Sequence, residues 1–383
     1  MLLTIYSILA LAYWVFLAFY LLINGKKIQY LSSIEVSKVQ VDVAPSVAIV
    51  IAIRNEEYSL RDALTSVCNL NYGNYKVLAV NDRSTDNSGK ILSELAAHYQ
   101  NLAVINIESL PGGWLGKNYA LYTGSISTGH EYLLFTDADV LYKKDLLSKS
   151  INYCLKNDLD HLTVLPGILS RSAMLKSLLL TFIIMLTALL RPWAAKIKTS
   201  SASMGVGAFN LVKRNTYKQA GTHKAIAMRP DDDLKLAENI KAAGGSSDVL
   251  YGLGELELEW YASIKEFING LMKNTFSGFN YNIFKAIGAA IGILVFFVLP
   301  LPAILIFGGF PERILAMCML LFQAILYGGM PGANGKWWYS FLIIYTGTAM
   351  IFIIIKSAIV TLYRGGIYWR DTFYSLAELR KKK

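Results

Sequence analysis

Apolar positions follow two different patterns along this chain. Residues 1–24 are almost entirely apolar, and similar runs lie near residues 286–309, 313–330 and 340–362. Each run approaches the roughly 20 residues that a helix needs to cross a bilayer core. Between about residues 42 and 170, by contrast, short apolar runs alternate with polar stretches. The pattern therefore predicts an α/β domain inserted between an N-terminal transmembrane anchor and a C-terminal transmembrane bundle.

Four short apolar runs predict the strands of the α/β domain. They cover residues 46–53, 76–80, 102–107 and 132–136. The first run (SVAIVIAI) is continuous and rich in β-branched residues, which is typical of a parallel strand buried on both faces. Helical spacing follows three of the runs, at residues 59–70, 88–99 and 117–127. Alternating strands and helices predict βαβ units and a doubly wound, mostly parallel sheet.

The expected domains are an anchor at 1–25, a catalytic domain at 42–280, a transmembrane region at 284–362 and a basic interfacial tail at 363–383. Residues 172–193 are also apolar, and we expect them to form a helix in the membrane interface. A crossing there would separate the acidic cluster 231–233 from Asp137 and Asp139. Pro300 and Pro302 interrupt the first C-terminal run, so we expect that run to turn back rather than cross fully.

The orientation is predicted from the basic residues beside the apolar runs. Lys26 and Lys27 directly follow the first run, and the positive-inside rule then places the catalytic domain in the cytoplasm. No cleavage signal follows the run, which favours an uncleaved anchor. We therefore expect an integral membrane protein, with a bacterial inner membrane as its setting.

Composition supports this interpretation. The 383 residues are 54% hydrophobic and carry a formal net charge of +10. Lys and Arg gather beside the apolar runs and at residues 380–383, as is typical near anionic lipid headgroups. The sequence contains no nucleic-acid-binding motif, and its three Cys and four His have no metal-ligand spacing. We therefore expect a membrane partner, no nucleic-acid partner and no zinc site.

Candidate chemistry begins with the string FTDAD at residues 135–139, which ends a predicted strand. In extended backbone, Asp137 and Asp139 point to the same face. Two ionised carboxylates so close together need a cation or a donor-rich ligand between them. Mg²⁺ and similar ions take one or two protein carboxylates together with phosphate oxygens of a substrate.

Further acidic residues lie at the ends of other predicted elements. Glu56 follows the first strand, Asp82 ends the second, and three aspartates at 231–233 precede a predicted helix at 234–243. Each of them alone is explained equally well by helix capping or an Asx-turn. Together with Asp137 and Asp139 they predict a ligand site at the carboxyl ends of the strands, where open α/β sheets bind ligands.

The order of the motifs resembles that of membrane-bound family 2 glycosyltransferases with the GT-A fold. The motifs are IxIRNEE, VNDRSTD, GWLGKNYA, FTDAD, GxGAFxLVKR and DDDLKLA. The loop 113–117 (GWLGK) is most similar to the branch of hopanoid-associated and carotenoid-ester glycosyltransferases, and more distantly to ceramide glucosyltransferases. The resemblance covers about residues 45–280 and, more loosely, the C-terminal apolar helices.

The resemblance implies roles for five donor-site residues. Glu56 and Asp82 match the positions that hold the uracil and ribose of a UDP-sugar. Asp137 matches the first aspartate of the metal motif, near the ribose, and Asp139 matches the second, which ligates Mn²⁺ or Mg²⁺. Lys117 matches a basic residue that meets the diphosphate.

The resemblance also implies a catalytic base. The family's Glu-Asp pair corresponds to Asp232 and Asp233, with Asp233 as the general base. Because three aspartates run together here, the register Asp231-Asp232 stays open. A carboxylate is suited to this role, since an acceptor hydroxyl must lose its proton as it attacks the sugar.

The implied function is inverting transfer of a single sugar from a UDP-sugar to a hydroxyl or carboxyl of a lipid-like acceptor. A polysaccharide synthase is the alternative within enzymes. The Gln-x-x-Arg-Trp string of processive synthases is missing, and residues 271–276 read LMKNTF in the matching region. An inactive membrane scaffold or a transporter component is the alternative from another class. A transporter predicts charges clustered inside the apolar spans.

Overall fold

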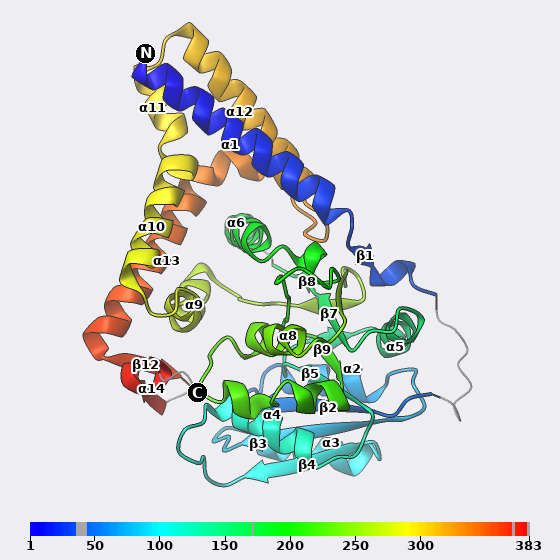
Figure 1. The fold of residues 1–383 in the computed structure, drawn as a ribbon. Coiled ribbons are helices and arrows are strands. Elements are labelled where there is room, and N and C mark those ends of the chain that lie inside the picture. Colours follow the sequence, from blue (N-terminus) through cyan, green and yellow to red (C-terminus); the bar gives the residue numbers. More distant parts are fainter. Residues whose placement is uncertain (36–43, 171, 370–371, 381–383) are drawn as a thin grey trace. The chain divides into compact units, whose positions relative to one another are not determined.

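The structure, a computed structural model, describes residues 1–35, 44–170, 172–369 and 372–380. Two compact units make up the chain. One combines Met1–Lys27 and Ser170–Leu190 with the segment that begins at Trp260, and the other combines Ile28–Leu169 with Arg191–Glu259. The second unit contains the sheet, and the first contains most of the long apolar helices (Figure 1).

An eight-stranded sheet forms the centre of the second unit. Its order is β1 (Gln29–Tyr30), β10 (Ser247–Tyr251), β7 (His161–Leu165), β9 (Asn210–Lys213), β5 (Tyr132–Thr136), β2 (Val47–Ile53), β3 (Tyr75–Asp82) and β4 (Leu102–Ile107). All neighbours pair in parallel except β9, which is antiparallel to both β5 and β7. The prediction of a mostly parallel α/β sheet is therefore confirmed.

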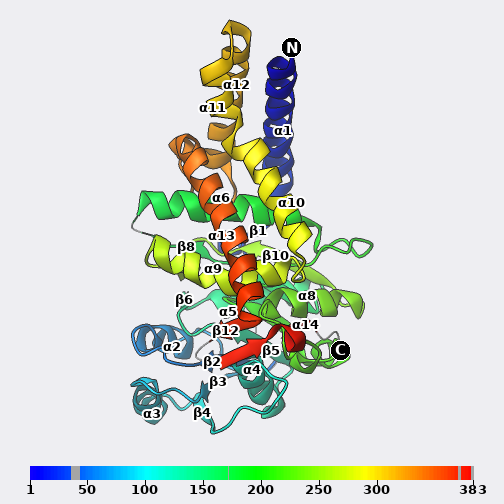
Figure 2. The same cartoon turned by 90° about the vertical axis from the view of Figure 1, so that its left-hand side faces the viewer.

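Buried apolar side chains explain why β2 lies inside this sheet. All seven of its residues are buried, and β3 and β5 flank it. On one face, Val50 and Leu133 pack in a cluster with residues of α4 (Gly116–Ile126), α7 (Arg214–Gln219) and α8 (Asp232–Ala242). The helices α2 (Leu60–Cys68) and α3 (Ser88–His98) lie on the other face (Figure 2). Right-handed crossovers require this, because the chain moves outward from β2 to β4 and then returns to β5 through α4.

Two features of this unit differ from the simple βαβ expectation. The sheet includes the antiparallel β9, which is only four residues long. A second small sheet is formed by β6 (Leu141–Tyr142), β11 (Leu256–Leu258) and β8 (Gly167–Ile168). The helix α5 (Leu146–Lys156) connects β6 to β7.

Helix α8 begins at Asp232, two residues before the predicted start, so two of the three clustered aspartates belong to its first turn.

The first unit consists of helices, most of them apolar, with a short hairpin between the last two. The helices are α1 (Leu2–Gly25), α6 (Ala173–Leu190), α9 (Ile264–Gly278), α10 (Ile283–Ile293), α11 (Pro300–Phe307), α12 (Phe310–Gly329), α13 (Ile343–Arg364) and α14 (Leu376–Arg380). The hairpin pairs β12 (Gly366–Trp369) with β13 (Thr372–Ser375). Helices α1 and α12 lie side by side (Figures 1 and 2).

Four helical segments of the described residues are long and apolar enough to cross a membrane. They are Leu2–Gly25, Ala173–Ala194, Phe310–Gly329 and Trp337–Arg364. A fifth is possible in the bent pair Ile283–Val298 and Pro300–Phe307. These lengths and compositions indicate membrane association. The interfacial position expected for residues 172–193 stays a prediction, since α6 is also long enough to span.

The bend in the pair occurs where the sequence places its prolines. The two helices meet at 45°, next to a π-helical segment at Leu294–Val298. Pro300 has no N–H to give to the carbonyl of Phe296, four residues earlier. The indole of Trp14 donates to that carbonyl instead, at 2.9 Å, and the hydroxyl of Tyr6 donates to the carbonyl of Val295 at 2.6 Å. Helix α1 thereby satisfies backbone groups that the broken helix cannot, as a lipid environment requires.

Candidate active site

The carboxyl ends of three neighbouring parallel strands bring the predicted acidic residues to one edge of the sheet. Asp82 is the last residue of β3, Glu56 follows β2, and Asp137 and Asp139 follow β5. The Asp82 side chain is buried, whereas that of Asp137 is 39% exposed. Asp137 is thus the more accessible of the two to a ligand arriving from solvent.

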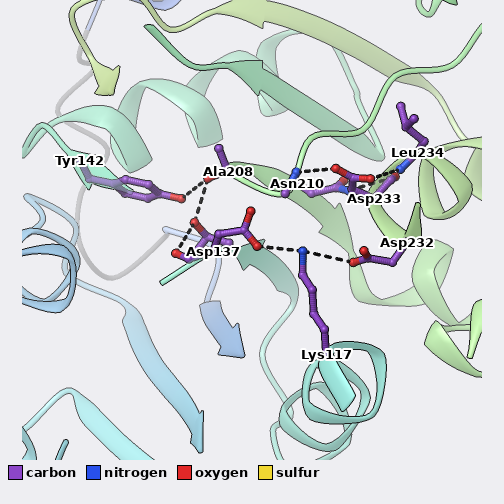
Figure 3. Close-up of polar contacts among 10 residues, drawn as sticks. Lys117, Asp137, Tyr142, Ala208, Asn210, Asp232, Asp233 and Leu234 are labelled. Atoms are coloured by element: carbon purple, nitrogen blue, oxygen red, sulfur yellow. Dashed lines mark hydrogen bonds and ion pairs between the residues drawn. The ribbon is translucent and has the colours of Figure 1, made fainter. Parts of the chain in front are cut away.

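Lys117 connects two of the acidic motifs. It lies in the first turn of α4, and its Nζ is 2.8 Å from Asp137 Oδ1 and 3.6 Å from Asp232 Oδ2 (Figure 3). The segment 226–229 holds the start of α4 in place, because Asn118 Nδ2 lies within hydrogen-bond distance of three backbone carbonyls in that segment. The lysine is therefore a cation on a firmly held backbone, with a flexible side chain between two carboxylates.

Asp233 is held by backbone donors at the start of α8. Its Oδ2 accepts a hydrogen bond from the N–H of Gly207 at 2.8 Å, and its Oδ1 accepts one from Leu234 at 2.8 Å (Figure 3). A Cβ at Gly205 would lie 2.0 Å from the Asp233 carbonyl oxygen, and one at Gly207 would lie 2.4 Å from Asp137 Oδ2. Both glycines are therefore needed for this loop to approach the two aspartates so closely.

Two other acidic residues are held by arginines close to them in sequence. Arg229 binds Asp231 through Nε and Nη2 at 2.9 and 2.7 Å. Arg83 binds the buried Asp82 in the same way, at 2.8 and 3.3 Å. Such two-point pairs fix a carboxylate in one orientation. The structure thus brings Lys117, Asp137 and Asp232 into direct contact, while Asp231 and Asp82 are oriented by arginines.

The electrostatics of the cluster reflect several carboxylates in a confined space. Burial, with the neighbouring Asp137 and Glu56, raises the pKa of Asp139 to about 7. Burial, with Asp232 beside it, raises the pKa of Asp233 to about 7. Both carboxyls are therefore poised to take up or release a proton near neutral pH.

Lys117 carries the compensating positive charge. Burial lowers its pKa, but the charges of Asp137, Asp232 and Asp233 outweigh that effect, and the pKa of Lys117 is raised above its usual value. Lys117 is therefore charged whenever these aspartates are. A small cavity of about 10 Å³ adjoins the cluster, about the room that one water molecule needs. Its polar lining comes from Lys117, Thr136, Asp137, Asn210, His223, Asp232 and Asp233.

Residues behind the cluster hold the loop that carries Gly207. The carbonyl of Ala208 accepts hydrogen bonds from Thr136 Oγ1 at 2.8 Å and from Tyr142 at 3.0 Å. Asn210 Nδ2 donates to the carbonyl of Asp233 at 3.4 Å, and His161 Nε2 lies 2.6 Å from Asn210 Oδ1. Because an amide oxygen can only accept, the imidazole carries its proton on Nε2.

Sequence reasoning did not identify these supporting residues. The motif GxGAFxLVKR begins with two glycines, which are the available sequence signal for a close backbone approach. His161 and Asn210 carried no such signal, since a lone buried histidine and a strand asparagine are common in protein cores.

The donor set at the strand ends fits a divalent cation that also binds a diphosphate. No group of three His, Cys, Asp or Glu residues in the described ranges is arranged to hold a metal by protein ligands alone. Mg²⁺-type sites, however, often use one or two carboxylates and take their other ligands from substrate phosphates and water. Asp137 and Asp139 supply such a pair, and the raised pKa of Asp139, caused by burial and by Asp137 and Glu56, is a cost that a bound cation would relieve.

Comparisons with known proteins agree with this geometry. Residues 48–193 match the sequence family described as Glycosyl transferase family 2. A β-monoglucosyldiacylglycerol synthase of Nostoc is 36% identical over 27% of this chain and 22% of its own length. A 4,4'-diaponeurosporenoate glycosyltransferase of Staphylococcus haemolyticus is 31% identical over 32% of the chain and 30% of its own length. A poly-β-1,6-N-acetyl-D-glucosamine synthase of Staphylococcus epidermidis is 27% identical over 56% of the chain and 50% of its own length.

A solved structure extends the likeness to most of the chain. A mannosyltransferase of Pyrobaculum calidifontis, in complex with GDP-Man and Mn²⁺, aligns over 94% of this chain and 99% of its own, with a TM-score of 0.55 and 15% identity. At that identity the likeness shows the fold alone. The curated relatives, for their part, are matched over half of their own length or less.

The family match, the sheet topology and the clustered aspartates are thus all consistent with the predicted glycosyltransferase site. The family match over residues 48–193 agrees with the predicted enzyme class, a sugar-transferring enzyme. Residues 48–193 thus match the Glycosyl transferase family 2 model, and the fold agrees with the predicted GT-A class.

Proposed function

We propose that the protein transfers a single sugar from a UDP-sugar to a hydroxyl or carboxyl of a lipid-like acceptor in the membrane, with inversion at the sugar carbon. The observation that carries this proposal is the Lys117 ammonium group, which lies between Asp137 of the predicted donor site and Asp232 of the predicted base pair. A diphosphate leaving group and an attacking hydroxyl need such a cation and such a carboxylate close to each other.

The donor half of the site uses the strand ends. Asp82, oriented by Arg83, and Glu56 are the proposed contacts of the ribose and the uracil. Lys117 is the proposed contact of the diphosphate, where it neutralises charge that develops as the bond to the sugar breaks. Asp137 and Asp139 would hold Mn²⁺ or Mg²⁺, which supplies further neutralisation of the leaving diphosphate.

Asp233 is the proposed general base. Its pKa, raised to about 7 by burial and by Asp232, suits a group that must accept a proton near neutral pH. Each of its oxygens accepts one backbone hydrogen bond, and a carboxylate oxygen has a second acceptor site left for the acceptor hydroxyl. The Arg229 pair on Asp231 supports the register Asp232-Asp233 over Asp231-Asp232.

One base on one side of the sugar supports direct displacement. The acceptor oxygen attacks the anomeric carbon as its proton passes to Asp233, and UDP leaves from the opposite face. The sugar therefore inverts at the reacting carbon. Asp232, buried beside Asp233 and near Lys117, keeps the lysine close to the reacting groups.

A lipid acceptor is supported by the apolar helices and by the relatives. Four helices among the described residues are long and apolar enough to cross a membrane, and the named relatives include a β-monoglucosyldiacylglycerol synthase and a 4,4'-diaponeurosporenoate glycosyltransferase. We further propose that the catalytic domain faces the cytoplasm, where UDP-sugars are made, in line with Lys26 and Lys27 after α1.

Polysaccharide synthesis is the second candidate, because the poly-N-acetylglucosamine synthase is matched over more of the chain than the other relatives named. The two functions give different products. Membranes containing the protein should release UDP from one member of a panel of UDP-sugars, and mass analysis of the lipid extract should find one added sugar per acceptor. A ladder of sugar additions, or a water-soluble polymer, would instead establish the synthase.

A further inference from the structure

Lys117 occupies one carboxylate oxygen of Asp137, a proposed metal ligand. Its Nζ is 2.8 Å from Asp137 Oδ1, in a direct ion pair, and its side chain is only 16% exposed. Two further basic side chains at this edge, Arg83 and Arg229, are each bound to the acidic residue of their own motif. Lys117 is different, because it bridges carboxylates from two separate motifs (Figure 3).

Binding of an ammonium group and a divalent cation to the same carboxylate oxygen is electrostatically unfavourable. Mg²⁺ binds carboxylate oxygens at about 2.0–2.1 Å. With the lysine on the same oxygen, two positive centres would lie within a few ångströms of each other in a partly buried site, where screening by water is weak. Either the lysine moves or the metal stays out.

We propose that Lys117 is a resident counter-ion of Asp137 that gives up this carboxylate only when a donor diphosphate offers it other oxygens, so that metal ion and nucleotide bind together. The inference rests on the proposed function, since it takes Asp137 and Asp139 as the metal carboxylates. The chain itself then blocks metal binding until the nucleotide arrives.

The geometry allows the exchange with little rearrangement. The start of α4 is fixed, because Asn118 donates to backbone carbonyls and the N–H of Leu115 donates to the carbonyl of Ala227 at 2.8 Å. Only the four-carbon side chain has to move. Asp232 Oδ2, at 3.6 Å, remains within reach as a second partner while the lysine turns towards the diphosphate.

The test is a set of Mn²⁺ binding titrations on the full-length protein in detergent, with and without saturating UDP. The wild type should bind Mn²⁺ weakly alone and at least about tenfold more tightly with UDP, within the usual range of coupling between two ligands. Lys117→Met should bind Mn²⁺ alone at least about tenfold more tightly than the wild type, and UDP should add little.

Lys224→Met is the matched control. It removes the same charge from the same unit, but the Lys224 ammonium lies over the Tyr122 ring, 5.1 Å from its centroid, and forms no carboxylate pair that the structure describes. It should keep the wild-type pattern, which separates the local ion pair from a general change in net charge. Lys117→Gln repeats the test if the methionine variant folds poorly, and thermal unfolding with Mn²⁺ alone gives a second reading, since only the Lys117 variants should be stabilised.

The outcomes separate this inference from the proposed function. If the wild type binds Mn²⁺ only with UDP, but the folded Lys117 variants bind Mn²⁺ alone no better than the wild type, the counter-ion role is wrong and the metal site stands. If neither the wild type nor any variant binds Mn²⁺ even with UDP, the metal assignment itself fails and this inference fails with it.

Discussion

The clearest structural prediction concerns Gly207, which touches both halves of the site. Its N–H donates to Asp233, and a Cβ added to it would meet the Asp137 carboxylate. Replacing it with alanine keeps the N–H and adds a single methyl group. The methyl carbon would lie 2.4 Å from Asp137 Oδ2 and 3.1 Å from its Cγ, whereas ordinary contacts begin at 3.4 Å. Gly207→Ala therefore isolates the position of Asp137 from the hydrogen bond to Asp233.

The size of the effect follows from that overlap. Asp137 must move by about 1 Å, but its Oδ1 is held by Lys117 at 2.8 Å, so the strain is shared between the carboxylate and the loop. Overpacking of this kind costs about 1–3 kcal/mol. A misplacement of about 1 Å in a catalytic site can lower turnover about 10²-fold.

The assay is UDP binding in the presence of Mn²⁺, together with sugar transfer from the donor that the panel identifies. Gly207→Ala should weaken UDP binding and lower transfer about 100-fold, with the protein still folded. Gly129→Ala is the matched control, because an added Cβ there meets nothing within 4 Å. Wild-type binding and transfer in folded Gly207→Ala would show that Asp137 does not need its present position, and the reasoning about this loop would be refuted.

Two further predictions concern the metal and the pH dependence of stability. Asp139→Ala, or EDTA added to the wild type, should lower transfer by about 10²-fold or more while the unfolding temperature changes little, because the proposed role of this carboxylate is to hold the cation. Transfer that persists in chelator would contradict the proposed metal role. Burial lowers the pKa of His161 to about 4, so the unfolded chain takes up its proton at a higher pH than the folded protein does. The stability that the neutral imidazole contributes should be complete above about pH 6.5 and be lost by up to about 3 kcal/mol as pH falls towards 4. His161→Gln should lack this part of the pH dependence in thermal unfolding between pH 7 and pH 4, and an unchanged slope would show that His161 is not its source.

The sequence predicted the parallel core of the domain well, for a physical reason. A strand such as β2, with seven consecutive buried residues, has to be apolar throughout, and little else in a chain produces that pattern. The acidic residues then followed, because the ends of neighbouring parallel strands necessarily meet at one edge. The role of Lys117 could be predicted only from the family resemblance, because a lysine at the start of a helix does not by itself indicate a binding site.

The remaining features depend on contacts that no local pattern records. Strand β9 is four residues of mixed character, and it becomes a strand because β5 and β7 leave a space between them. The bond from Trp14 to the carbonyl of Phe296 joins residues that are 282 positions apart. The prolines predicted a run that turns back instead of crossing, which stays a prediction, and the structure has a 45° bend beside them. No sequence pattern indicated the indole that donates to the carbonyl freed at this bend.

The most direct test of the central claim measures donor binding and turnover in the same preparations of Asp233→Asn and Asp231→Asn. The first variant loses the proposed base, and the second changes an adjacent carboxylate that Arg229 holds. We expect Asp233→Asn to bind UDP about as tightly as the wild type and to lose about 10²-fold or more in turnover, the usual scale for a positioned general base. Asp231→Asn should lose much less. Equal losses in the two variants, or full turnover in Asp233→Asn, would contradict the account.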